Sequence, residues 1–324
     1  MKLGRTRSGA AGSAGSVTVD RSVRIGSVQL PSAVLCASGT AGHGDELARY
    51  FDLSSIGAVV VKSLSVEPWP GNPAPRVHQT PAGMLNSVGL QGPGIEAWRR
   101  HGLPELLASG TRVVASIWGR SVEDFAAAAD ALGAAELPAR VVALEVNLSC
   151  PNLDGGSHLF AHDPDATIEV LRAVAARWDR PIWAKLSPNT DRLVEVAGAA
   201  ATAGAEAVTL GNTVMGMVID TEHRRPLLGA GRGGLSGPAM HPVAVRAVYD
   251  CRAAWPELPI VGVGGVASGV TAVELLLAGA QAVQVGTATF AEPAAAARVD
   301  RELTEWCRDH GVAVVSELSG QAQR

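Results

Sequence analysis

The stretch 141-VVALEVNLSCPN-152 is the clearest guide to the fold of this chain. Its mainly apolar first half, 141–146, passes directly into a polar segment that contains Asn147, Cys150 and Asn152. Short apolar runs of this kind are typical of strands that are buried on both faces, as in a parallel sheet. The stretch therefore predicts a buried strand that ends in a thiol between two carboxamides.

The same unit recurs along the chain. Seven other mainly apolar runs end in polar or glycine-rich stretches, at 33–37, 57–61, 112–117, 181–186, 206–210, 259–263 and 281–285. Segments with helical spacing lie between them, for example 121–132, 163–178, 191–203 and 268–279. Alternation through eight units predicts an α/β protein with a (β/α)₈ TIM barrel. A doubly wound open sheet also alternates and is the alternative.

The domain organisation follows from the limits of this alternation. We expect one catalytic barrel domain over 21–312, with a disordered tail at 1–20 and a C-terminal tail at 313–324. Three connections, 63–92, 151–162 and 213–237, are longer than a βα loop needs. We expect them to form lids or binding loops at the C-terminal face of the barrel.

Composition excludes several classes of function. The net charge of −4, with both signs mixed, gives no basic surface for nucleic acid. We find no apolar stretch long enough to span a membrane and no secretory signal, so a cytoplasmic location is expected.

The four cysteines are far apart and form no C-x-x-C pair, which argues against a metal or iron–sulfur site built from this chain alone. Cys36, Cys251 and Cys307 lie in predicted strands or helices and are interpreted as small buried apolar residues. Cys150 differs because it follows a strand in a polar loop. It is the candidate catalytic cysteine.

The carboxyl ends of all strands in a barrel meet on one face, so the side chains at those ends are candidates for one site. The polar ones are Ser38, Lys62, Ser63, Ser116, Asn147, Lys185, Asn212, Thr213 and Thr287. A lysine at a strand end is often a surface residue whose stem covers apolar area. Two of them on the same predicted face, Lys62 and Lys185, favour a functional role.

Glycines follow the last two strands, at Gly264, Gly265 and Gly286. They allow backbone N–H groups to approach an anion closely, at the usual phosphate position of barrel enzymes, and so predict a phosphorylated cofactor or substrate. Residues 262–267 also match the dinucleotide pattern G-x-G-x-x-A. That pattern belongs to the first βα turn of an open sheet, whereas here it falls in the seventh unit.

Six further segments make a specific set. They are NLSCPN (147–152), VVVKSLSVEPWPGNPAPR (59–76), PAGMLNSVGLQGPG (81–94), AVTLGNTVMGMVIDTEHRRPLLG (207–229), GGLSGPAMHPVAVRAVYD (233–250) and VGVGGVASGVTAVELLLAGAQAVQVGTATF (261–290). In this order, over about 22–310, the chain resembles class 1 dihydroorotate dehydrogenases. The segment DGGSHLFAHDP (154–164) is similar to subclass 1B.

The resemblance implies one FMN per chain and the oxidation of dihydroorotate to orotate in de novo pyrimidine (UMP) synthesis. Cys150 would take the C5 proton while hydride passes from C6 to flavin N5, with Lys62 in the catalytic set. The implied substrate-binding residues are Lys62, Asn86, Ser87, Val88, Gly89, Leu90, Asn147, Asn152, Asn212 and Thr213. The implied FMN-binding residues are Ser38, Lys62, Ser63, Ser116, Asn147, Lys185, Gly211, Gly237, Gly264, Gly265, Gly286 and Thr287.

Subclass 1B also implies a separate electron-transfer subunit carrying FAD and a [2Fe–2S] cluster, in a heterotetramer; a homodimer is the other implied assembly. Three residues depart from the family pattern: Ser116 where Asn is usual, His241 where Lys is common, and Trp69. They leave open a dehydrogenase of a related dihydropyrimidine ring, or a non-catalytic FMN-binding relative.

Overall fold

The predicted barrel is present. The computed structural model describes residues 18–134, 136–149 and 160–323. Within these ranges eight parallel strands form a barrel in which each pairs with the next barrel strand, and the last pairs with the first to close it. They are β3 (Val34–Cys36), β4 (Val59–Val60), β7 (Val113–Ile117), β8 (Val141–Asn147), β9 (Ile182–Leu186), β10 (Ala207–Leu210), β15 (Ile260–Val263) and β16 (Ala282–Val285). Closure excludes the open-sheet alternative.

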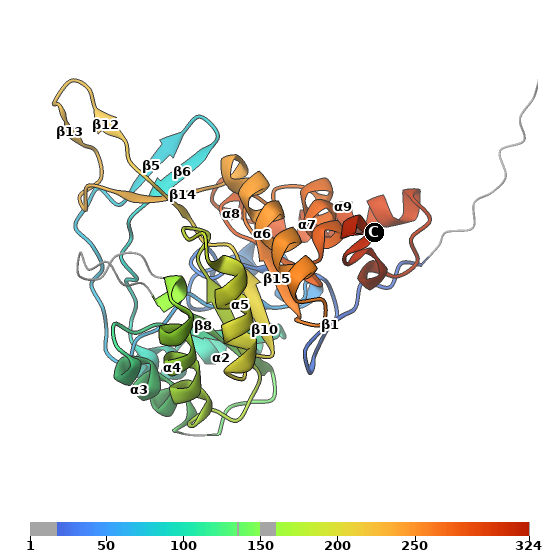
Figure 1. Ribbon diagram of the computed structural model, residues 1–324, viewed down its shortest axis with the longest axis horizontal. Coiled ribbons are helices and arrows are strands. Elements are labelled where there is room, and N and C mark those ends of the chain that lie inside the picture. Colours follow the sequence, from blue (N-terminus) through green and yellow to red (C-terminus); the bar gives the residue numbers. More distant parts are fainter. Residues whose placement is uncertain (1–17, 135, 150–159, 324) are drawn as a thin grey trace, which may run out of the picture.

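Helices alternate with these strands and cover the outside of the barrel (Figure 1). In the described part of the chain they are α1 (Ile95–Arg100), α2 (Gly102–Ala108), α3 (Val122–Gly133), α4 (Pro164–Ala175), α5 (Leu193–Thr202), α6 (His241–Ala254), α7 (Gly269–Ala278), α8 (Ala288–Ala291) and α9 (Ala295–Asp309). Side-chain caps fix several starts: Ser121 accepts from the Asp124 amide, and Ser268 forms a capping box with Thr271. No helix among these is long and apolar enough to cross a membrane.

The interior of the barrel is mostly apolar, because its parallel strands are covered on both faces. A group of polar side chains interrupts it. Glu145, Lys185, Thr209 and Gln284, from four different barrel strands, are all buried. Burial of polar groups is costly unless they pair with one another, so their contacts matter for the site described below.

Two of the long connections meet above the barrel. Segment 63–92 contains β5 (Val77–Thr80) and β6 (Gly83–Asn86), and segment 213–237 contains β11 (Val214–Gly216) and β14 (Gly233–Ser236). These four strands form one antiparallel sheet in the order β11-β14-β6-β5. Two further strands, β12 (Ile219–Asp220) and β13 (Arg225–Pro226), make a hairpin that projects on the same side of the molecule (Figure 1). We predicted that these segments are loops. They contain strands instead, because residues from the two segments pair with each other.

The chain ends of the described region pack on the barrel. A hairpin of β1 (Val23–Ile25) and β2 (Val28–Leu30) lies at its amino end, where the Ser27 amide donates to the Glu206 carboxylate at 2.8 Å, just before β10. Residues 313–323, predicted as a C-terminal tail, include the 3₁₀ helices η5 (Val315–Leu318) and η6 (Gln321–Gln323). Val315 and Leu318 are buried, so this segment contributes to the core.

Four more 3₁₀ helices lie in the connections. They are η1 (Glu46–Arg49), η2 (Leu53–Ser55), η3 (Phe160–His162) and η4 (Pro238–Met240). The last of them leads directly into α6 and turns the chain away from the end of β14. It therefore helps to place the glycine-rich segment next to the mouth of the barrel.

Candidate active site

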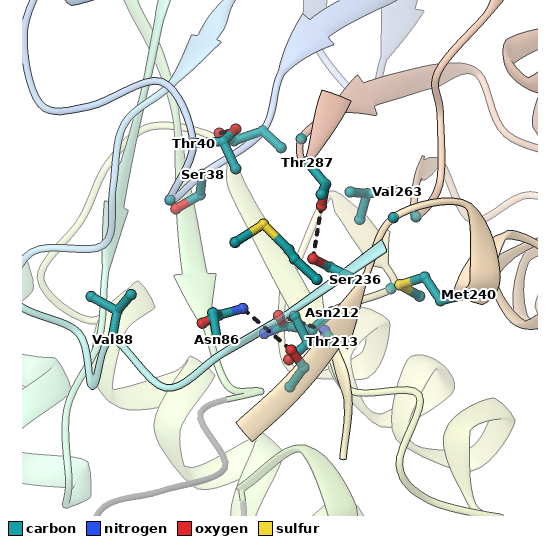
Figure 2. Close-up of a pocket in the computed structure, with 18 of the residues that line it drawn as sticks. Ser38, Thr40, Asn86, Val88, Asn212, Thr213, Ser236, Met240, Val263 and Thr287 are labelled. Carbon is teal, nitrogen blue, oxygen red and sulfur yellow. Dashed lines mark hydrogen bonds between the residues drawn. The ribbon is translucent and has the colours of Figure 1, made fainter. Parts of the chain in front are cut away.

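A cavity lies between the carboxyl ends of the barrel strands and the β5, β6 and β14 strands above them (Figure 2). It brings together most of the residues predicted from the sequence. Those that line it are Ser38, Lys62, Ser63, Asn86, Ser87, Val88, Gly89, Leu90, Asn147, Lys185, Gly211, Asn212, Thr213, Gly237, Gly264, Gly265, Gly286 and Thr287. Because they come from every part of the chain, barrel closure is what assembles them.

A chain of hydrogen bonds runs across the floor of this cavity. The Asn147 Nδ2 donates to Ser63 Oγ at 3.1 Å, and Ser63 lies 3.4 Å from the hydroxyl of Ser38. The Ser149 hydroxyl donates to Asn147 Oδ1 at 2.8 Å and accepts from the amide of Asn212. The ends of β3, β4, β8 and β10 are therefore tied together, and the two carboxamides are held in fixed orientations.

The segment after β10 is held by a residue that the sequence analysis missed. Asn189, in the loop after β9, donates to the carbonyl of Thr213 at 2.9 Å and accepts from the Met215 amide at 2.9 Å. Asn212 itself accepts from the Thr213 amide at 2.8 Å. The sequence signal for Asn189 was a polar residue three positions beyond the end of a strand. Such residues are too common for this one to be singled out.

The sheet above the barrel supplies Asn86 from the end of β6. Its Nδ2 lies 3.5 Å from the Gly234 carbonyl of β14, and Thr213 packs against the same glycine, since a Cβ there would lie 1.8 Å from Thr213 Oγ1. Figure 2 shows Asn86, Asn212 and Thr213 gathered at one side of the cavity. Three of the four predicted asparagines thus lie in one cavity.

Both predicted lysines also face the cavity. Lys185 is nearly buried, with its side chain 7 % exposed, and its Nζ lies 3.7 Å from Glu145 Oε1. Lys62 lies close enough to His43 that its charge lowers the pKa of that histidine, adding to the larger effect of burial, while Glu46 opposes them. The cavity therefore contains cationic groups that suit a ligand with negative charge.

Glycines at the other side of the cavity form a close-fitting cradle. Gly237, Gly264 and Gly265 have φ values of 96°, 141° and 65°, which favour glycine. A Cβ on Gly265 would lie 2.6 Å from the Cβ of His241 and 3.0 Å from the Gly237 carbonyl oxygen. These glycines line the cavity and present backbone without side chains where a phosphate group needs N–H donors, so they fit a phosphorylated cofactor.

Two side-chain contacts hold this cradle in place. His241, one of the departures from the family pattern, contacts the Gly264 carbonyl through Nδ1 at 2.8 Å and Glu274 through Nε2 at 3.1 Å. Thr287 donates to Ser236 Oγ at 2.8 Å (Figure 2). The histidine therefore supports the glycine segment through this contact, and it does not line the cavity itself.

Three predicted site residues are not among the described residues that line the cavity. Ser116 is fully buried and lies behind Ser63, whose hydroxyl is 2.9 Å away, so it does not line the cavity. Cys150 and Asn152 lie outside the described residues. The buried state predicted for Cys36, Cys251 and Cys307 is confirmed.

The sequence analysis did not single out several residues that line the cavity. These are Ala37, Gly39, Thr40, Val77, Met84, Gly234, Ser236, Met240, Val263 and Phe290. Ser236 and Val263 directly precede the predicted site residues Gly237 and Gly264. Their position next to these glycines is the sequence signal that could have found them. Within the described ranges no group of three or more His, Cys, Asp or Glu side chains is placed to hold a metal ion.

The fold and the cavity define a (β/α)₈-barrel enzyme whose active site lies at the carboxyl ends of the strands. A sequence profile of the family described as dihydroorotate dehydrogenase matches residues 21–306. The chain therefore belongs to the dihydroorotate dehydrogenase family, and it is an oxidoreductase.

Individual relatives support the same assignment. The catalytic subunit of dihydroorotate dehydrogenase B (NAD⁺) from Geobacter sp. (strain M21) is 46% identical over 301 residues, which cover 93% of this chain and 97% of the relative. The protein of the same name from Desulforudis audaxviator (strain MP104C) is 47% identical over 306 residues, covering 94% and 98%. The resemblance to subclass 1B is thereby confirmed.

Proposed function

We propose that this chain is the FMN-dependent catalytic subunit of a dihydroorotate dehydrogenase, which oxidises dihydroorotate to orotate in pyrimidine synthesis. One observation carries the proposal: Lys62, Asn86, Asn147 and Asn212 line a single cavity together with the glycine cradle. The names of the relatives support the substrate, and the chemistry of the cavity supports the cofactor.

The polar residues suit a ring that contains amides and carries a carboxylate. Carboxamides both donate and accept hydrogen bonds, as a cyclic diamide requires, and the amides of Asn147 and Asn212 are already oriented by Ser149. Ser87 lines the same cavity, and its buried hydroxyl has no hydrogen-bond partner among the described residues. It is available to the substrate. Lys62 would pair with the carboxylate.

The remaining lining residues suit FMN. Gly237, Gly264 and Gly265 would hold its phosphate, with Gly286 and Thr287 beside them, while Ser38, Ser63 and Lys185 would contact the flavin and its ribityl chain. Bound FMN would supply the acceptor for hydride. The chain's own part is to hold the substrate ring in the correct orientation and to exclude water from it.

The proton is assigned to Cys150, which we propose as the base that takes it from C5 of the substrate. A free thiol has a pKa of about 8.5, so this role needs activation or raised pH. Ser149, the preceding residue in the sequence, is anchored by its hydrogen bonds with Asn147 and Asn212, which both line the cavity.

The relatives are named as catalytic subunits of an NAD⁺-linked enzyme. We propose that a partner subunit carrying FAD and a [2Fe–2S] cluster takes electrons from this chain in the cytoplasm, in a heterotetramer; a homodimer is the alternative. The test is reconstitution. A partner that restores NAD⁺ reduction by dihydroorotate would support the proposal, and turnover at the same rate without any partner would contradict it.

The central experiment is anaerobic. The purified protein is checked for bound FMN, dihydroorotate is added, and the flavin absorbance at about 450 nm is followed in wild type, Cys150→Ala and the matched control Cys307→Ala. We expect rapid bleaching in wild type and in the control, and at least a hundredfold slower bleaching in Cys150→Ala. A flavin that stays oxidised in wild type would contradict the assigned substrate, and bleaching by another dihydropyrimidine would identify a related ring dehydrogenase.

A further inference from the structure

A carboxylate lies beneath the cavity, inside the barrel, and the proposed chemistry does not use it. Glu145, on β8, is fully buried and is absent from the residues that line the cavity. Taking a carboxylate out of water costs several kcal/mol unless it is paired, and an apolar pair of similar volume is often as stable. The fold alone therefore gives little reason for a carboxylate here.

The contacts of Glu145 divide between its two oxygens. Oε2 accepts from Thr209 Oγ1 and from Gln284 Nε2, both at 3.0 Å. Oε1 has no hydrogen-bond partner among the described residues, and it lies 3.7 Å from Lys185 Nζ. Two neutral donors, one on β10 and one on β16, thus fix one oxygen, and the other faces the ammonium group.

Lys185 connects this buried group with the cavity. It lines the cavity, whereas Glu145, Thr209 and Gln284 do not. Glu145 is the partner in the one ion pair that Lys185 makes within the described ranges. Because Lys185 is so little exposed, water does little to hold its side chain, and the carboxylate of Glu145 is the charged group that faces it.

We propose that Glu145 is a positioning residue that keeps the Lys185 ammonium group in place and directed at the cavity, with Thr209 and Gln284 holding the carboxylate in place. The proposal rests on the proposed function, because the cation matters through its effect on bound FMN. A fixed positive charge favours the more negatively charged reduced flavin over the oxidised one. Glu145 therefore acts on the flavin through Lys185, and indirectly raises its reduction potential.

The test measures binding and potential, separately from turnover. The midpoint potential of bound FMN and its dissociation constants in both redox states are measured for wild type, Glu145→Gln, Lys185→Met and the double variant. Thr209→Val is the matched control, since it removes one hydrogen bond to Glu145 without removing charge. The thermal midpoint of each apoprotein reports stability alone.

In Glu145→Gln we expect the affinity for reduced FMN to fall about tenfold relative to the affinity for oxidised FMN. This change lowers the two-electron potential of the bound flavin by about 30 mV. Lys185→Met should lower it at least as far, and the double variant should match Lys185→Met, because the glutamate acts only through the lysine. Thr209→Val should change the ratio less than threefold. If Glu145→Gln does not fold, Glu145→Asp, which withdraws the carboxylate, should show a smaller shift of the same sign.

Four results would overturn the proposal. An unchanged potential with a lower thermal midpoint would mean that Glu145 is only structural. A higher potential in Glu145→Gln would mean that Lys185 keeps its position without its partner. Wild type that binds no FMN would refute the proposed function and this inference together, whereas wild type that binds and reduces FMN while Glu145→Gln matches it would refute the inference alone.

Discussion

The Asn147 side chain donates a hydrogen bond to the Ser63 hydroxyl at 3.1 Å, although 84 positions separate the two residues in the chain. They end β8 and β4, which are not neighbours in the barrel, since β7 lies between them. The bond therefore crosses the end of a strand. It shows that a contact across the mouth of the barrel, together with the local bond from Ser149, sets the orientation of the amide.

Ser149 bridges the two described carboxamides at the strand ends, so its hydroxyl should matter for substrate binding. In Ser149→Ala, the buried amide oxygen of Asn147 and the amide of Asn212 each lose a partner. An unsatisfied buried group costs about 1–3 kcal/mol. We expect kcat/KM for dihydroorotate to fall about ten- to hundredfold, with FMN content retained. Steady-state kinetics measure this, and exposed Ser316→Ala is the control. Equal values in both variants would refute the bridge.

Asn189, in the loop after β9, holds the segment after β10 through two direct hydrogen bonds. Its loss should affect substrate binding more than the chemical step. Asn189→Ala removes the bonds to the Thr213 carbonyl and the Met215 amide. We expect KM for dihydroorotate to rise about tenfold while kcat changes less than threefold, because the reacting groups stay in place. A variant that loses kcat at unchanged KM would show that the segment has a different role.

The glycine cradle can be tested with a matched pair of substitutions. Gly265 and Gly231 both have positive φ, at 65° and 78°, but a Cβ would meet His241 at the first and nothing within 4 Å at the second. Gly231→Ala should cost about 1 kcal/mol of stability, with FMN affinity unchanged. Gly265→Ala should cost about 1–3 kcal/mol more and weaken FMN binding at least tenfold. Denaturation and flavin-fluorescence titration separate the two effects, and similar FMN affinities would contradict the cradle.

Because Cys36 is buried, the stability of the fold should decrease at alkaline pH. Burial raises the pKa of this thiol from 9.0 to about 12. A raised pKa means that the folded state keeps its proton while the unfolded state loses it, so the contribution is complete below pH 9 and is lost as pH rises toward 12. The loss should be about 1.4 kcal/mol for each pH unit in this window.

Urea unfolding between pH 7 and 11 checks this prediction, with Cys36→Val as the comparison because it has no thiol to ionise. The free energy of unfolding of wild type should fall more steeply above pH 9 than that of the variant. Parallel curves over the whole range would mean that this thiol ionises equally in both states.

Much of the fold was predictable because its signal is local. The eight apolar runs 33–37 to 281–285 correspond to the eight barrel strands, with bounds that differ by one or two residues. The alternation of strand and helix, and the polar residue at each strand end, require no knowledge of distant contacts. The same reasoning placed Lys62, Asn147 and Lys185 on one face.

The differences from expectation and the omissions concern residues whose neighbours are far away in the chain. Ser116 was predicted to contact FMN, yet it lies behind Ser63 because that serine occupies the nearer position. Segments 63–92 and 213–237 were expected to be loops, and they pair with each other as strands. Glu145 was counted only as part of an apolar run, since nothing in 141–146 reveals the lysine beside it.

The sequence by itself determined the barrel, the face that carries the site and the family, because periodic burial and short motifs are properties of neighbouring residues. The tertiary structure decided which polar groups meet: Asn147 with Ser63, Asn86 with Gly234, and Glu145 with Lys185. The physical reason is closure of the barrel. It brings strand ends from distant parts of the chain within hydrogen-bonding distance, and no local pattern encodes those contacts.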